Sequence, residues 1–96
     1  MLAHFLLAPL LLAPPRLVSA TPPESGQKLY NIYCARCHGR DGRLGLNGAH
    51  DLTKSTLNAA GRSYMVTNGF GKMPGFKSEL TAAEVQRVVE YSLTLK

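Results

Sequence analysis

Apolar residues recur at helical spacing in three separate stretches of the chain. The first begins near residue 25, and its apolar face follows the i, i+3, i+4, i+7 pattern of one helix side: Gly26, Leu29, Tyr30, Tyr33, Cys34 and Cys37. One short helix is therefore expected to carry both cysteines of the chain on its apolar face. A second helix is expected from about Leu57 to Thr67, with Asn68 and Gly69 as a left-handed stop.

The clearest helix signal lies near the C-terminus. In the stretch TAAE, Thr81 and Glu84 have the spacing of a capping box, and Leu80 with Val85 fits the hydrophobic staple around it. The helix that follows has one mostly apolar face, formed by Val85, Val88, Val89, Ser92 and Leu95, with Tyr91 at its margin.

Glycine-rich segments separate these helices. Residues 39–48 contain four glycines in ten positions, which excludes a regular element and predicts a loop. Residues 69–76, GFGKMPGF, are also too rich in glycine and proline to be helical, and no β-hairpin signal occurs. The pattern predicts an all-α domain of three to four short helices joined by long loops. Loops of that length in a compact domain usually enclose something or carry function.

The N-terminal stretch has a different pattern. Residues 5–12 are apolar, two prolines follow, and residues 18–20 are Val-Ser-Ala. A short apolar core followed by small residues is typical of a secretory signal peptide, here cleaved after Ala20. A membrane span needs about 20 apolar residues, so we expect no stable membrane insertion after cleavage. The predicted division is a signal peptide at 1–20 and one periplasmic domain at 21–96.

Size and charge limit the possible classes of protein. A domain of about 75 residues buries only about 60% of its unfolded surface, and it usually needs a disulfide, a metal or a bulky cofactor. The two cysteines allow at most one disulfide. The formal net charge of +5 is compatible with nucleic-acid binding. However, an exported chain with no basic run and no matching motif is not expected to bind nucleic acid.

Both cysteines and a histidine share one five-residue window, as Cys34, Cys37 and His38. A redox C-x-x-C motif normally opens a helix after a strand, where the helix dipole lowers a thiol pKa, but these cysteines end a helix. A zinc site would need a fourth ligand, and His50 is the only other histidine after residue 20. The third interpretation is covalent haem, with two thioether bonds and the adjacent histidine on the iron. Haem would also supply the bulky core that the domain lacks.

Two methionines after residue 20 are candidates for a second axial ligand. Met65 lies inside a helical pattern, where packing in the core is the expected role. Met73 is flanked by Gly71, Pro74 and Gly75. Glycine there would let the backbone approach a flat ligand, and proline would stiffen the loop. A histidine and a methionine on opposite faces are the ligand pair that raises the haem potential for electron transfer.

The chain resembles a small bacterial class I c-type cytochrome over essentially all of residues 21–96. The matching segments, in chain order, are GQKLYNIYCARCHGRDG, DLT, VTNGFGKMPGF and LTAAEVQRVVEYSLTL. The resemblance implies the cytochrome c fold wrapped around one covalently bound haem c. It also implies thioether bonds from Cys34 and Cys37, and axial ligation of the iron by His38 and Met73.

The resemblance further implies that the first and last helices cross near Gly26, with Tyr30 and Tyr91 packed at the contact. The chain departs from many relatives because residues 39–50 contain no proline near the carbonyl that accepts the ring N–H of the haem histidine. A carbonyl of this loop is still expected to accept that N–H, since ligating histidines nearly always have such a partner. His50 is expected to be a loop residue and not a ligand.

These expectations describe a single-electron carrier that moves electrons between periplasmic or membrane redox proteins. It is not an enzyme, because both axial positions are filled and the iron has no open site for a substrate. It is expected to be a monomer whose partners have acidic docking surfaces. Five basic residues would form a basic collar that steers such partners: Arg36, Arg40, Arg43, Lys72 and Lys77. A solvated face that only aids solubility is the alternative.

Two other functions are compatible with the same residues. The first is a haem-bearing subunit permanently bound to a dehydrogenase or reductase, which an exposed apolar patch would favour. The second is a peroxidase-like enzyme, in which Met73 dissociates to admit a ligand.

Overall fold

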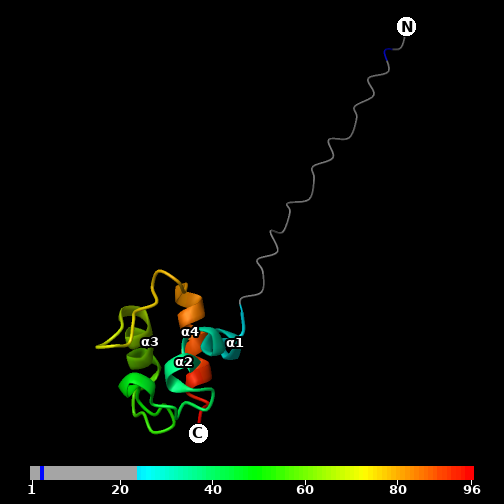
Figure 1. The fold of residues 1–96 in the computed structure, drawn as a ribbon. Helices are drawn as coiled ribbons and strands as arrows, with labels where there is room; N and C mark the ends of the chain where they lie inside the picture. The colour runs from blue at the N-terminus through cyan, green and yellow to red at the C-terminus, as the bar shows by residue number, and fades with distance from the viewer. Residues whose placement is uncertain (1–2, 4–23) are drawn as a thin grey trace.

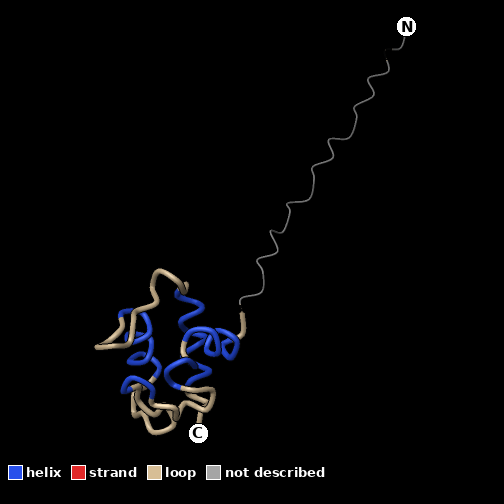
Figure 2. Tube along the Cα trace, in the orientation of Figure 1, coloured by secondary structure: helices blue, strands red, loops and turns tan. Residues whose placement is uncertain are grey.

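The computed structural model describes residue 3 and residues 24–96, so nearly all of the expected signal peptide lies outside the described residues. The described part is helical and contains no strand (Figure 2), which confirms the predicted all-α class. Its elements are α1 (Gly26–Tyr33), α2 (Ala35–His38), the 3-10 helix η1 (Leu46–Gly48), α3 (Ala59–Asn68) and α4 (Ala82–Ser92). The segment η1 falls in the glycine-rich stretch where only a loop was expected.

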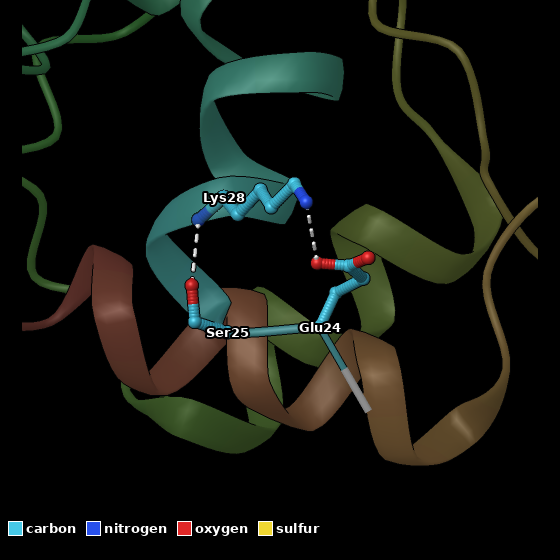
Figure 3. Close-up of polar contacts among 3 residues, drawn as sticks. All are labelled: Glu24, Ser25 and Lys28. Carbon is cyan, nitrogen blue, oxygen red and sulfur yellow. Dashed lines mark hydrogen bonds and ion pairs between the residues drawn. The ribbon is translucent and has the colours of Figure 1, made fainter. Parts of the chain in front are cut away.

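Helix α1 begins with a side-chain cap. The Ser25 hydroxyl accepts a hydrogen bond from the Lys28 backbone N–H at 3.1 Å, which satisfies one of the free donors of the first turn. The Lys28 ammonium lies 3.1 Å from the Glu24 carboxylate, and Figure 3 shows both contacts. This ion pair is exposed, so it contributes at most about 1 kcal/mol to stability.

The prediction of one helix through both cysteines was wrong at Cys34. That residue has a φ of −111°, far from the helical value, so the helix breaks there. Its N–H still bonds to the Tyr30 carbonyl at 2.8 Å, and its own carbonyl accepts from His38 N–H at 3.0 Å. The break starts α2, the separate turn that carries Cys37 and His38.

Helix α3 starts two residues later than the pattern predicted. The Asn58 side chain accepts a hydrogen bond from Gly61 N–H at 2.9 Å, and this cap places the first helical residue at Ala59. At the other end Asn68 is still helical, whereas Gly69 has a φ of 77°. Gly69 therefore ends the helix with a positive φ, but its ψ of 172° lies outside the left-handed helical region, so the predicted left-handed stop was wrong in its detail.

Helix α4 begins with the predicted capping box. The Thr81 hydroxyl accepts from Glu84 N–H at 3.2 Å, and the Glu84 carboxylate accepts from Thr81 N–H at 2.9 Å. The four predicted apolar-face residues within the helix are buried: Val85, Val88, Val89 and Ser92. The helix ends at Ser92, so half-buried Leu95 packs against the core from the segment that follows.

Helix α4 lies between α1 and α3 and contacts both (Figure 1). At the contact with α1, a Cβ atom on Gly26 would collide with the Arg87 carbonyl, so only glycine allows this approach. The Tyr30 and Tyr91 rings pack there with centroids 5.2 Å apart and an interplanar angle of 58°. The predicted crossing of the first and last helices is confirmed.

Candidate functional site

A cavity of about 440 Å³ lies among the helices, within the usual size of a ligand site. Every α-helix contributes to its mainly apolar wall, together with the loop before α3 and the loop after it. The lining residues are Tyr30, Cys34, His38, His50, Leu52, Lys54, Ser55, Thr56, Leu57, Arg62, Met65, Val66, Met73, Val88 and Ser92.

His38, at the end of α2, lies at the cavity wall with one ring nitrogen already bonded. Its Nδ1 lies 3.0 Å from the His50 carbonyl oxygen. Because a carbonyl can only accept, Nδ1 is the nitrogen that carries the hydrogen, and Nε2 keeps a free lone pair. The expected accepting carbonyl in residues 39–50 is therefore confirmed, and it belongs to His50. A metal-binding histidine is oriented by this kind of contact.

The two thiols have different surroundings. Cys34 is 7% exposed and lines the cavity, whereas Cys37 is half-buried in the next turn and does not form part of the wall. Burial raises the pKa of the Cys34 thiol to about 11. A catalytic C-x-x-C needs a thiol pKa below the ordinary value, so the redox-disulfide interpretation is disfavoured. Among the described residues no group of three or more His, Cys, Asp or Glu side chains could hold a metal ion.

Met73 reaches the cavity from a tight turn after α3. Phe70 and Met73 exchange two backbone hydrogen bonds of 3.0 and 2.9 Å, and Phe76 N–H bonds back to the Val66 carbonyl at 2.8 Å. The structure also brings Met65 to the cavity wall, half-buried on α3. The expected packing role of Met65 therefore stays a prediction, now at the cavity wall.

Two glycines around Met73 have a packing role that was not predicted from the sequence. A Cβ on Gly69 would lie 2.6 Å from both Gly75 N and the Met73 carbonyl oxygen. A Cβ on Gly75 would lie 2.6 to 2.8 Å from the backbone of Thr67 and Asn68. These glycines let the loop close against itself and against the end of α3, and this closure positions the methionine.

Arg62, which lines the cavity although it is charged, was not among the predicted site residues. Arg62 precedes Met65 by three residues and Val66 by four, so it shares the inward face of α3. A cation on an apolar helix face is the signal that could have identified it.

The cavity residues fit a haem. The wall is mainly apolar and suits a flat macrocycle; Cys34 lines it, and Cys37 follows in the next turn of the chain. His38 offers a free Nε2 and Met73 a thioether, which are the ligand types found on haem iron in electron-transfer proteins.

Comparisons with known proteins agree with this fit. A family model described as cytochrome c oxidase, cbb3-type, subunit III matches residues 21–91. Cytochrome c6 of Leptolyngbya boryana is 40% identical over 75 residues, which are 72% of this chain and 87% of that protein. Among solved structures, the KustC0563 c-type cytochrome is 29% identical with a TM-score of 0.68, covering 76% of this chain and 99% of that chain. Dihydro-heme d1 dehydrogenase NirN is 27% identical with a TM-score of 0.62, over 74% of this chain and 16% of that chain.

The fold and the site define a protein that encloses a haem. The chain belongs to the family of small class I monohaem c-type cytochromes. It carries covalently bound haem c, transfers electrons between redox partners and is not an enzyme. Within the part of the chain that the structure describes, no helix has the length and apolar character needed to cross a membrane.

Proposed function

We propose that Cys34 and Cys37 hold the haem through thioether bonds and that His38 and Met73 are the axial ligands of its iron. The observation that carries this proposal is that His38 and Met73 line one cavity, with the Nε2 of His38 left free by the bond to His50. Each bond forms when a thiol S–H adds across a vinyl group, which consumes no oxidant.

The bound iron supplies one-electron cycling between Fe(III) and Fe(II). The chain then has three tasks. His38 is oriented by the His50 carbonyl, Met73 is held by its turn, and the apolar wall excludes water. With His38 and Met73 both bound to the iron, the iron would have no open position for a substrate.

We also propose that residues 1–20 are a signal peptide cleaved after Ala20, and that domain 21–96 works in the periplasm as a monomer. The small residues before Thr21 support this, and so does the start of the family match at residue 21.

Intact-mass analysis of the exported protein tests attachment and processing together. The expected mass is that of Thr21–Lys96 plus one haem, and a pyridine haemochrome should show that both vinyl groups are consumed. The single variants Cys34→Ala and Cys37→Ala are matched controls, because each should show one remaining vinyl group. Haem that acid–acetone extracts would contradict attachment, and full-length protein in the membrane fraction would contradict cleavage.

The proposed partners are redox proteins with acidic docking surfaces. The five residues of the basic collar are exposed: Arg36, Arg40, Arg43, Lys72 and Lys77. One of them has a second role, because the Arg43 guanidinium donates to the Lys96 carbonyl at 2.7 Å and holds the C-terminal segment. The other four lie within four residues of His38 or Met73 along the chain.

If the basic collar steers association, the rate of electron transfer to an acidic redox protein should fall as ionic strength rises. Charge reversal of Arg36, Arg40, Lys72 and Lys77 together should slow the reaction at low salt by about tenfold or more. Arg43→Glu is measured separately because it also releases Lys96. Lys28→Glu, outside the basic collar, should have little effect. If the stopped-flow rate changes neither with ionic strength nor with charge reversal, the basic collar serves only to aid solubility.

A haem-bearing subunit of a larger enzyme is the second candidate. The matching family model is described as an oxidase subunit, and NirN contains a domain of this fold within a much longer chain. Two aromatic side chains are largely exposed: Phe70, in the turn that carries Met73, at 70%, and Tyr64, on α3, at 67%. Size-exclusion chromatography with light scattering of the protein recovered from its native source distinguishes the two candidates. A diffusing carrier should elute with the mass of one chain, and an enzyme subunit with the mass of a larger complex.

A further inference from the structure

Arg62 is a buried cation at the cavity wall. It is 8% exposed, and arginine is almost never buried to this extent unless it is paired. Its Nε donates to the Leu57 carbonyl at 2.9 Å and its Nη1 to the Ser92 hydroxyl at 3.0 Å. Its Nη2 has only the carbonyls of Leu52 and Ser55, at 3.5 and 3.4 Å. These two contacts are longer than the usual 2.7–3.2 Å of a good hydrogen bond.

Every partner of Arg62 within residues 24–96 is neutral, and the cavity lining contains no Asp or Glu. Asp51, which precedes Leu52 in the chain, already accepts hydrogen bonds from the Thr53 backbone N–H and hydroxyl. The Thr53 hydroxyl donates to it at 2.6 Å and holds the pKa of Asp51 below its usual value, with Lys54 and Arg43 adding to the effect. The positive charge of Arg62 therefore has no protein anion opposite it in the described chain.

A purely structural role explains only part of this arrangement. Arg62 gathers three carbonyls of residues 52–57 and links that loop to Ser92 on α4. Neutral donors could hold those carbonyls without the cost of burying a charge, which is several kcal/mol for an uncompensated ion. Arg62 lines a ligand site, and its unpaired charge and incompletely bonded Nη2 would both be satisfied by an anion.

We propose that Arg62 is the counter-ion of one haem propionate, with Nη2 as a donor to that carboxylate. The proposal rests on the haem attachment proposed above. A guanidinium and a carboxylate make a strong, charge-assisted pair, and Ser92 with the loop carbonyls holds the guanidinium in place. Arg62 is then a positioning residue, since it fixes the free edge of a macrocycle whose other edge is bonded to α2.

The pair has a consequence for the reduction potential. An uncompensated propionate favours Fe(III), so its neutralisation by Arg62 raises the potential. A unit charge about 10 Å away, at an effective dielectric constant of about 20, changes an equilibrium roughly tenfold. For one electron, a tenfold change corresponds to about 59 mV.

Two substitutions separate the charge from the loop contacts. Arg62→Met removes both and should lower the potential by about 59 mV, a tenfold change in the Fe(III)/Fe(II) equilibrium. Arg62→Lys loses most of the carbonyl contacts but keeps the charge, and should retain most of the wild-type potential. Lys54→Met removes the exposed cation of the same wall and should have a smaller effect. Equal losses in Arg62→Lys and Arg62→Met, or no loss in Arg62→Met, would overturn the proposal.

A measurement on the unsubstituted protein covers the case in which Arg62→Met does not fold. In the diamagnetic Fe(II) state, ¹⁵N-labelled protein should show nuclear Overhauser contacts between the Arg62 guanidinium hydrogens and the propionate methylenes. The same spectrum should show the Met73 methyl group shifted strongly upfield by the haem ring current. A shifted Met73 methyl without Arg62 contacts overturns the counter-ion alone. An unshifted Met73 methyl contradicts the proposed ligation instead.

Discussion

The double variant Cys34→Ala, Cys37→Ala is expected to lose most of its folded structure, because the haem fills the centre of the domain. An empty cavity of about 440 Å³ would cost at most roughly 10 kcal/mol at about 24 cal/mol per Å³. That value is as large as the whole stability of a typical domain, about 5–15 kcal/mol. The protein core around the cavity is small, and α1 and α3 contact only α4 among the longer helices.

Far-ultraviolet circular dichroism with thermal unfolding measures this loss. Cys34→Ala alone is the control, because Cys37 can still form one thioether bond and retain the haem. The expected order of helix content is wild type, then the single variant, then the double variant. A haem-free double variant with native helix content and a cooperative melt would show that the polypeptide folds without its cofactor.

Substitution of Met73 is expected to have the largest effect on the iron. A thioether is a soft ligand that favours Fe(II), so Met73→His should keep a six-coordinate, low-spin iron with a lower potential. The decrease should be on the order of 0.1 V, since axial ligands move haem potentials over about 0.8 V. Met73→Ala should open the sixth position, bind carbon monoxide in the Fe(II) state and gain peroxidase activity.

Met65→Leu is the matched control, and the structure makes it a demanding one because Met65 lies at the same cavity wall. This swap nearly conserves volume, so stability should change by less than about 1.5 kcal/mol. Oxidised wild type and Met65→Leu should both show the weak near-infrared band of sulfur–Fe(III) ligation, and Met73→Ala should lose it. The opposite pattern would identify Met65 as the ligand.

Elements with local signals were predicted closely. Thr81 and Glu84 are three residues apart, and the two hydrogen bonds of their capping box form as the spacing indicates. Gly69 ends α3 with a positive φ, which glycine adopts without steric cost. The crossing at Gly26 came from the resemblance to c-type cytochromes, not from periodicity, because a pattern within one helix does not identify the helix it contacts.

The predicted helix boundaries were wrong where the local backbone conformation departs from what the spacing of apolar residues indicates. Cys34, Cys37 and the residues before them continue one apolar stripe, yet the chain leaves helical geometry at Cys34. The spacing of apolar residues indicates which side chains face the core. Two helical segments separated by a break can give the same spacing as one continuous helix. The start of α3 was misplaced because Asn58 is both a cap and a possible first-turn residue.

The sequence by itself determined the haem-binding class of this protein, through the window from Cys34 to His38 and the methionine in its glycine-rich loop. Cys34, Cys37 and His38 share one five-residue window, and Met73 is marked by the glycines and proline beside it, so each of the two signals is local along the chain. Only the tertiary structure decided that the His50 carbonyl orients His38, that Met65 shares the cavity, and that Arg62 is buried there with no anion opposite it among residues 24–96. The His38–His50 and Arg62–Ser92 contacts join residues 12 and 30 positions apart. They depend on the paths of the loops and on burial, and neither can be read from local spacing.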